Sequence, residues 1–137
     1  MAETIRKVEY FYATAPNKAG EGARLLALFK NAGVNLLAFS GFPSARRSQL
    51  DFVPTNPTHF LSVAKANGVK LKGPKTGFVV EGDDRVGAIA DLLGRLAAAK
   101  LNVTAVDAVC AGAGRFGAIL WVKPKDVARA TQVLGAM

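Results

Sequence analysis

Cysteine and histidine, two residue types that commonly act as a nucleophile, a base or a metal ligand, are rare and widely spaced in this sequence. The chain has one cysteine, Cys110, and one histidine, His59. One thiol cannot form an internal disulfide, and these two side chains alone cannot make a Cys/His zinc site. Neither has an activating neighbour in the sequence, and Asp83-Asp84 is a pair common in solvated turns. We therefore expect no enzymatic activity, no catalytic residue and no metal, with His59 on the surface of a helix.

A literal G-x-G-x-x-G motif occurs at residues 112–117. The dinucleotide-binding fingerprint requires a strand before the motif, a helix after it and an acidic residue about 20 positions further on. Here a strand-like run follows the motif, and no acid occurs in the last residues of the chain. We interpret the segment as a flexible hairpin loop, and we expect no cofactor.

The formal net charge of +8 raises the question of a nucleic-acid partner. Phosphate binding requires lysine and arginine side chains gathered on one surface. In this sequence they are scattered, and the densest groups are Arg46-Arg47 in a predicted loop and Lys70, Lys72 and Lys75 near a predicted edge strand. We interpret them as a solvated surface, so a nucleic-acid partner is not expected.

The apolar segments of the chain are short. Residues 25–29 and 118–122 fall well below the roughly 20 residues that a membrane-spanning helix needs. Residues 1–7 lack the apolar core of a secretory signal, and a single cysteine suits a reducing compartment. We expect a cytoplasmic protein that does not contact a membrane.

The elements that would position a binding site recur at a spacing of 67 residues. The recurrence has no gap, and the matched residues fall at predicted turns and helix ends. The matched pairs include Gly20 with Gly87, Asn35 with Asn102, Pro57 with Pro124, and Gly68 with Gly135. We interpret the chain as two copies of one structural unit.

Each copy begins with a strand-like run, residues 8–14 and 77–81, followed by a polar turn and an amphipathic helix. Gly33 ends the first of these helices as a left-handed cap, and Lys100 replaces it in the second. A hairpin and a second helix follow, and this helix begins at a proline and ends at a glycine. The first copy adds a final strand around residues 69–72.

This order of elements, βαββαβ, is ferredoxin-like. We predict an α+β protein with two such units in tandem, residues 1–73 and 74–137, each an antiparallel sheet with helices on one face. The second copy stops before its last strand, which leaves an open slot beside residues 78–80. We expect residues 69–72, the N-terminal strand or a second chain to occupy it, and we expect a homodimer.

The turn before the first helix of each copy, together with the exit from that helix, resembles the ACT-domain family of small-ligand regulatory modules. That family commonly shows Asp-Arg-Pro-Gly before the helix and a Gly-Ile-Asn-Ile-like exit. The matching segments are Asp84-Arg85-Val86-Gly87 and Leu101-Asn102-Val103 in the second copy, and Asn17-Lys18-Ala19-Gly20 and Ala32-Gly33-Val34-Asn35-Leu36 in the first. Val86 stands where the family has proline, and the first copy lacks the acidic residue.

The resemblance implies that an amino acid or a similar small molecule binds between two modules, against this turn and the start of the next strand. The implied ligand-binding residues are Asp84, Arg85, Val86, Gly87, Asn102, Val103, Asn17, Lys18, Ala19, Gly20, Asn35 and Leu36. A helix N-terminus would attract the ligand carboxylate, and Asn17 or Asp84 could accept hydrogen bonds from its ammonium group. Both side chains could instead cap their helices.

We therefore expect a regulatory protein that senses a small molecule, in particular an amino acid. One alternative is a regulatory subunit of a separate amino-acid metabolic enzyme. Another is a basic RNA-binding protein, because residues 115–121 share part of the strand pattern of RNA-recognition modules, which have the same βαββαβ order. Ala118 stands where such modules have a stacking aromatic, so we interpret Trp121 and Phe78 as core or interface residues.

Overall fold

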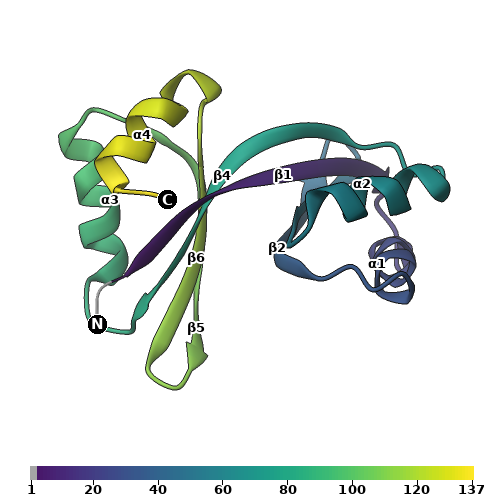
Figure 1. Ribbon diagram of the computed structural model, residues 1–137, viewed down its shortest axis with the longest axis horizontal. Coiled ribbons are helices and arrows are strands. Elements are labelled where there is room, and N and C mark those ends of the chain that lie inside the picture. The colour runs from purple at the N-terminus through teal and green to yellow at the C-terminus, as the bar shows by residue number, and fades with distance from the viewer. Residues whose placement is uncertain (1–2) are drawn as a thin grey trace. The chain divides into compact units, whose positions relative to one another are not determined.

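The computed structural model describes residues 3–137. Helices and strands alternate along the chain (Figure 1). They are β1 (Thr4–Pro16), α1 (Glu21–Asn31), β2 (Leu36–Ser44), β3 (Arg47–Pro54), α2 (Pro57–Ala66), β4 (Lys72–Asp83), α3 (Ala88–Ala98), β5 (Val103–Gly112), β6 (Arg115–Val122), the 3-10 helix η1 (Pro124–Asp126) and α4 (Val127–Leu134). The hydrogen-bonded strand order is β2-β3-β1-β4-β6-β5.

The chain forms two compact units, and the long strands β1 and β4 contribute to both. The first unit is Glu9–Lys75, and the second combines Met1–Val8 with Thr76–Met137. The strand order is β2-β3-β1-β4 in the first unit and β1-β4-β6-β5 in the second. Both sets have the neighbour relations of a ferredoxin-like sheet.

The core of the first unit is built on four phenylalanines between the sheet and the paired helices α1 and α2 (Figure 1). The side chains of Phe11, Phe29, Phe52 and Phe60 are at most 1% exposed. Phe60 contacts the other three rings and Phe29 contacts Phe52, with centroids 4.6 to 5.5 Å apart in these pairs. Alternation along β1 directs Phe11 and Ala13 into this core, which leaves Tyr12 and Thr14 on the side of the sheet that carries no helix.

The core of the second unit lies under α3 and α4, which are side by side in Figure 1. Its members include Phe78 and Val80 of β4, Leu92 of α3 and Leu120 of β6. Ile5 of β1 completes it, so the N-terminal strand fills the predicted open slot. This is one of the three occupants that we considered.

The last residue of the chain pairs with the outer side of that strand. Lys7 donates its backbone N–H to the carbonyl of Met137 at 3.0 Å, and Met137 donates its backbone N–H to the carbonyl of Ile5 at 3.0 Å. Arg95 supports the same corner, because its guanidinium donates to the carbonyl of Leu134 at 2.9 Å. The backbone of the chain end thus covers a strand edge that would otherwise be exposed.

The helix boundaries agree with several predictions from the sequence. Pro57 begins α2 and Pro124 begins η1, while Gly135 ends α4 with a φ of +62°. The exits of α1 and α3 also match, because Gly33 has a φ of +76° and Lys100 a φ of +61°. A lysine therefore adopts the left-handed conformation that glycine adopts more easily.

The repeat differs from the prediction in β6. Phe11 lies opposite Phe52, whereas its counterpart Phe78 lies opposite Leu120, one residue beyond the position that a gap-free spacing of 67 requires. The irregular pairing of β5 between Cys110 and Gly112 accommodates the extra residue. A gap-free register was therefore wrong for this hairpin.

The α+β class and the antiparallel sheet with helices are confirmed. The final strand predicted around residues 69–72 begins only at Lys72, and it is continuous with the first strand of the second copy as β4, which was not anticipated. The tandem repeat itself and its division at residues 1–73 and 74–137 remain predictions about the sequence. None of the helices within residues 3–137 is long and apolar enough to cross a membrane.

Candidate functional site

The twelve residues that the resemblance implies lie at opposite ends of two helices. Residues 17–20 precede α1 and residues 84–87 precede α3, whereas Asn35-Leu36 and Asn102-Val103 follow the ends of these helices. Each helix has 11 residues, which corresponds to a length of roughly 16 Å. In each half of the chain, the turn before the helix and the start of the strand after that helix are therefore separated by the length of the helix.

The turn before α3 is attached to the β5–β6 hairpin. The Asp84 carboxylate accepts a hydrogen bond from the Cys110 thiol, and this bond, more than desolvation, raises the pKa of Cys110. The backbone N–H of Asp84 donates to the carbonyl of Gly114 at 2.8 Å. Gly87 is the N-cap of α3, with a φ of +80° and no side-chain cap hydrogen bond. The capping role considered for Asp84 is therefore wrong.

Asn17 is also not a helix cap. Its side-chain oxygen accepts a hydrogen bond from the Ser48 hydroxyl at 3.1 Å, which attaches the turn to the start of β3. Gly20 is the N-cap of α1, with a φ of +92° and no side-chain cap hydrogen bond. Both turns thus present a glycine and the backbone of the first helical turn to an incoming group.

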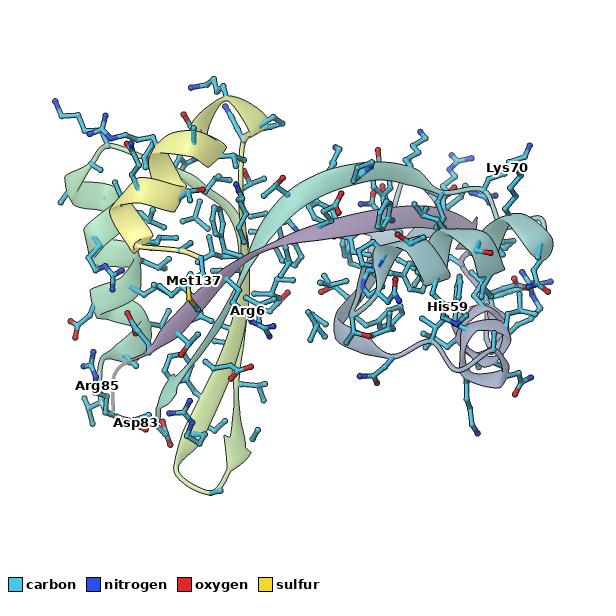
Figure 2. The ribbon with its side chains drawn as sticks, viewed as in Figure 1. Arg6, His59, Lys70, Asp83, Arg85 and Met137 are labelled. Atoms are coloured by element: carbon cyan, nitrogen blue, oxygen red, sulfur yellow. The ribbon has the colours of Figure 1, made fainter. Side chains whose placement is uncertain are left out.

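The charged side chains beside the two turns are paired with one another. Figure 2 shows Asp83 and Arg85 at the start of α3. Arg85 pairs with Asp91 at 2.7 Å, and Asp83 pairs with Arg115 at 2.8 Å. At α1, the largely buried Glu21 carboxylate already occupies the first turn, where it lies near the positive end of the helix dipole. Asp91 likewise lies in the first turn of α3, so each helix start already carries an acidic side chain that opposes an added carboxylate.

An open groove lies between α1 and the start of β2. Its volume is about 500 Å³. The groove is lined by Ala23, Leu26, Ala27, Phe29, Lys30, Val34, Asn35 and Leu36. Two implied binding residues, Asn35 and Leu36, belong to this lining, which joins them to residues of α1 that the sequence analysis did not select.

The groove combines apolar walls with two polar groups. Lys30 supplies an ammonium group at the end of α1, and Asn35 supplies an amide that can both donate and accept. Ala23 and Ala27 are one helical turn apart, so their small side chains leave the space open. The sequence signal that could have located this groove is a helix face with small residues, Ala23 and Ala27, followed by Lys30.

The groove borders an edge of the sheet, because β2 is the outermost strand of the first unit. Leu37 and Phe39 on this strand expose 37% and 39% of their surface. Large apolar side chains on an edge strand favour contact with another protein surface.

The remaining chemistry-bearing residues have structural surroundings. His59 lies on the exposed surface of α2, where its Nε2 donates to the carbonyl of Ala32 at 2.9 Å (Figure 2). Trp121 and Phe78 are buried, as predicted. Residues 112–115 form a tight hairpin turn between β5 and β6, as predicted. Among residues 3–137, no group of three or more His, Cys, Asp and Glu side chains could hold a metal ion.

Comparison with known proteins gives structural neighbours but no sequence relatives. No protein-family model and no curated protein matches this chain. Protein BT0572 from Bacteroides thetaiotaomicron matches 97% of this chain and 88% of its own, with a TM-score of 0.79 and 16% identity. The regulatory subunit of aspartate kinase from Thermus thermophilus matches 98% and 95%, with a TM-score of 0.67 and 12% identity.

A third structure, that of aspartokinase alpha and beta subunits, matches 98% of this chain and 95% of its own, with a TM-score of 0.66 and 16% identity. At such identities the likeness is one of fold, and it extends over nearly the whole chain. It confirms the fold that the resemblance to the ACT-domain family implies. This chain has the fold of ACT-type regulatory domains.

Proposed function

We propose that this chain is a regulatory protein that binds a small molecule, specifically an amino acid, and has no catalytic activity of its own. The observation that carries the proposal is the open groove between α1 and β2, which contains Asn35 and Leu36. Its volume lies in the range of small-molecule sites. The fold shared with regulatory subunits of aspartate kinase supports the same role.

The groove offers a place for each part of an amino acid. The Lys30 ammonium group and the Asn35 amide are suitable partners for the ligand carboxylate, and Leu26 and Leu36 for an apolar side chain. The ligand ammonium group needs an acceptor, and the groove lining contains no carboxylate. The acceptor therefore comes from elsewhere, and Asp84 remains our candidate for it.

We propose that a second copy of the chain completes the site and makes the protein a homodimer. The exposed Leu37 and Phe39 on the edge strand β2 provide an apolar surface beside the groove for that copy. The turn before a helix and the strand start after the same helix are a helix length apart. A turn and a strand start can therefore contact one ligand if they belong to different modules. Residues 84–87 would then act with residues 35–36 of a partner, and residues 17–20 with residues 102–103 of a partner.

A second candidate role is that of a regulatory subunit for a separate enzyme of amino-acid metabolism. The Thermus thermophilus neighbour is itself called a regulatory subunit, and the match covers 95% of it. Under this role the chain is cytoplasmic, and ligand binding changes its affinity for the catalytic chain.

The test is a thermal-shift screen of the full chain against the standard amino acids. A ligand present at about 100 times its Kd stabilises the folded state by about 2.7 kcal/mol, which is readily seen as a higher Tm. The variant Ala27→Leu fills the groove on an exposed helix position and should lose the shift while its unliganded Tm is unchanged. Ala97→Leu, at an exposed position of α3, is the matched control and should retain it.

Two results would contradict the proposal. One is the absence of any shift with every amino acid, and the other is an equal shift in the wild type and the Ala27→Leu variant. The dimer is tested separately by light scattering, where Phe39→Glu should give a monomeric mass because it places a charge on the exposed edge strand.

A further inference from the structure

The positive charge of the chain is concentrated in the first unit. Residues 9–75 contain nine Lys and Arg but three Asp and Glu, a formal charge of +6 out of the total of +8. Of the acids, Glu21 pairs with Lys18 and Arg24. Asp51 is buried, with 6% of its surface exposed. Most of the cations in this unit therefore have no acidic neighbour.

Four of these cations gather around the side of the sheet that carries no helix. Lys72 and Lys75 place their Nζ atoms 5.9 and 5.1 Å from the ring centroid of Tyr12. The Arg47 guanidinium lies 3.5 Å from the carbonyl oxygen of Thr14, and Arg46 is exposed in the adjoining turn. Within residues 3–137, none of the four cations forms an ion pair with a carboxylate.

The aromatic rings of Tyr12 and Phe42 belong to the same side. Tyr12 lies opposite Asp51, which lies opposite Ser40 of β2. Phe42 follows two residues later on β2, and 43% of its surface is exposed. Phe42 lies two strands across the sheet from Tyr12 and two residues further along the strand. This places the two rings roughly 12 Å apart. We call the set Tyr12, Phe42, Arg46, Arg47, Lys72 and Lys75 the basic-aromatic face.

Asp51, an acid on this side of the sheet, is withdrawn from solvent. Asp51 accepts a hydrogen bond from Gln49 at 2.9 Å. Burial raises the pKa of Asp51, although the hydrogen bond from Gln49 and the charge of Lys75 act in the opposite direction. The carboxylate is therefore poorly placed to repel an anion that approaches the exposed cations.

We propose that the basic-aromatic face binds single-stranded nucleic acid. Phosphates contact the four cations, and two bases stack on Tyr12 and Phe42. Proteins that bind single strands combine a basic groove with aromatic side chains on which bases stack, and the open side of a βαββαβ sheet is a common platform for this. The RNA alternative from the sequence concerned β6, where Phe116 and Trp121 are buried and unavailable for stacking.

An acidic protein segment would satisfy the cations but would leave the spaced aromatic rings without a role. The separation of the rings suits bases that are not immediate neighbours along a strand. This face is also opposite to the helices, so it is independent of the groove between α1 and β2.

The test is fluorescence anisotropy of the full chain with labelled oligouridine and oligodeoxythymidine of about 12 nucleotides. Four phosphate contacts predict that log K falls with log salt concentration with a slope of about −3. The double variant Lys72→Gln/Lys75→Gln should weaken binding and make the slope shallower by about 1.4. Phe42→Ser should weaken binding by at least about 5-fold without changing the slope.

The double variant Lys65→Gln/Lys123→Gln is the control, because it removes two exposed lysines that lie outside the basic-aromatic face. It should bind nearly as the wild type does. The proposal is overturned if neither oligonucleotide binds at about 50 mM salt. It is also overturned if Phe42→Ser binds unchanged and polyglutamate competes as well as unlabelled oligouridine, which would indicate an acidic protein partner.

Discussion

Lys100 occupies a backbone conformation that suits glycine, and its replacement by glycine should stabilise the protein. α1 and α3 end in the same way: Val34 donates to the carbonyl of Phe29, and Leu101 donates to the carbonyl of Leu96, each at 2.9 Å. The residue before each donor has a positive φ. It is a glycine at position 33 (φ +76°), whereas it is a lysine at position 100 (φ +61°).

Two opposing effects determine the size of the change. A side chain at a left-handed φ costs roughly 1–2 kcal/mol. Glycine loses more freedom on folding, which reduces the benefit by roughly 0.5–1 kcal/mol. We therefore expect Lys100→Gly to raise the free energy of unfolding by about 0.5–1 kcal/mol. Lys100→Ala removes the same charge but keeps the Cβ atom, so the difference between the two variants isolates the backbone effect.

The assay is urea denaturation of both variants and of Gly33→Ala. An added Cβ at Gly33 meets no atom within 4 Å, so the loss expected for Gly33→Ala, about 0.5–1 kcal/mol, also reflects the backbone alone. Ala99→Gly is the control, because Ala99 has a φ of −89° and gains nothing from glycine. If Lys100→Gly is no more stable than Lys100→Ala, the reasoning is refuted.

Three further substitutions test other parts of the structure. Because burial raises the pKa of Asp51, the folded state binds its proton more tightly, so stability falls as pH rises from about 4 through the raised pKa. Asp51→Asn should remove this fall in urea midpoints measured between acid and neutral pH, and an unchanged profile would contradict it. Asn56 accepts from the backbone N–H of His59 at 3.1 Å to cap α2, so Asn56→Ala should lower the free energy of unfolding by about 1 kcal/mol. Asp84→Asn should weaken a bound amino acid by roughly 1.5–3 kcal/mol in titration calorimetry while unliganded stability stays within about 1 kcal/mol. Unchanged affinity would remove Asp84 from the site.

Features that depend on neighbours in the sequence were predictable. Pro57 begins a helix because its ring fixes φ and removes an N–H that has no helical partner there. Gly33 and Gly135 follow helix ends because a left-handed residue is needed to close them. The alternation of Phe11 and Ala13 on one side of β1 likewise follows from strand geometry.

Features that depend on distant partners required the tertiary structure. Asp84 and Asn17 were candidates for helix capping, but each has a partner on another strand, Cys110 and Ser48, and a glycine occupies the cap position. Local propensity cannot identify a hydrogen-bond partner that lies about 30 residues away, because many side chains compete for it.

Contacts between distant parts of the chain also determine which strand completes the second unit and which residues line the groove. The sequence alone determined the order of helices and strands and which side of each is apolar, since both follow from periodicity. It did not determine that Ile5, from the start of the chain, packs in the second core, nor that Ala27 and Asn35 line one groove. These depend on which elements become neighbours when the chain buries its apolar surface, and that is a property of the whole fold.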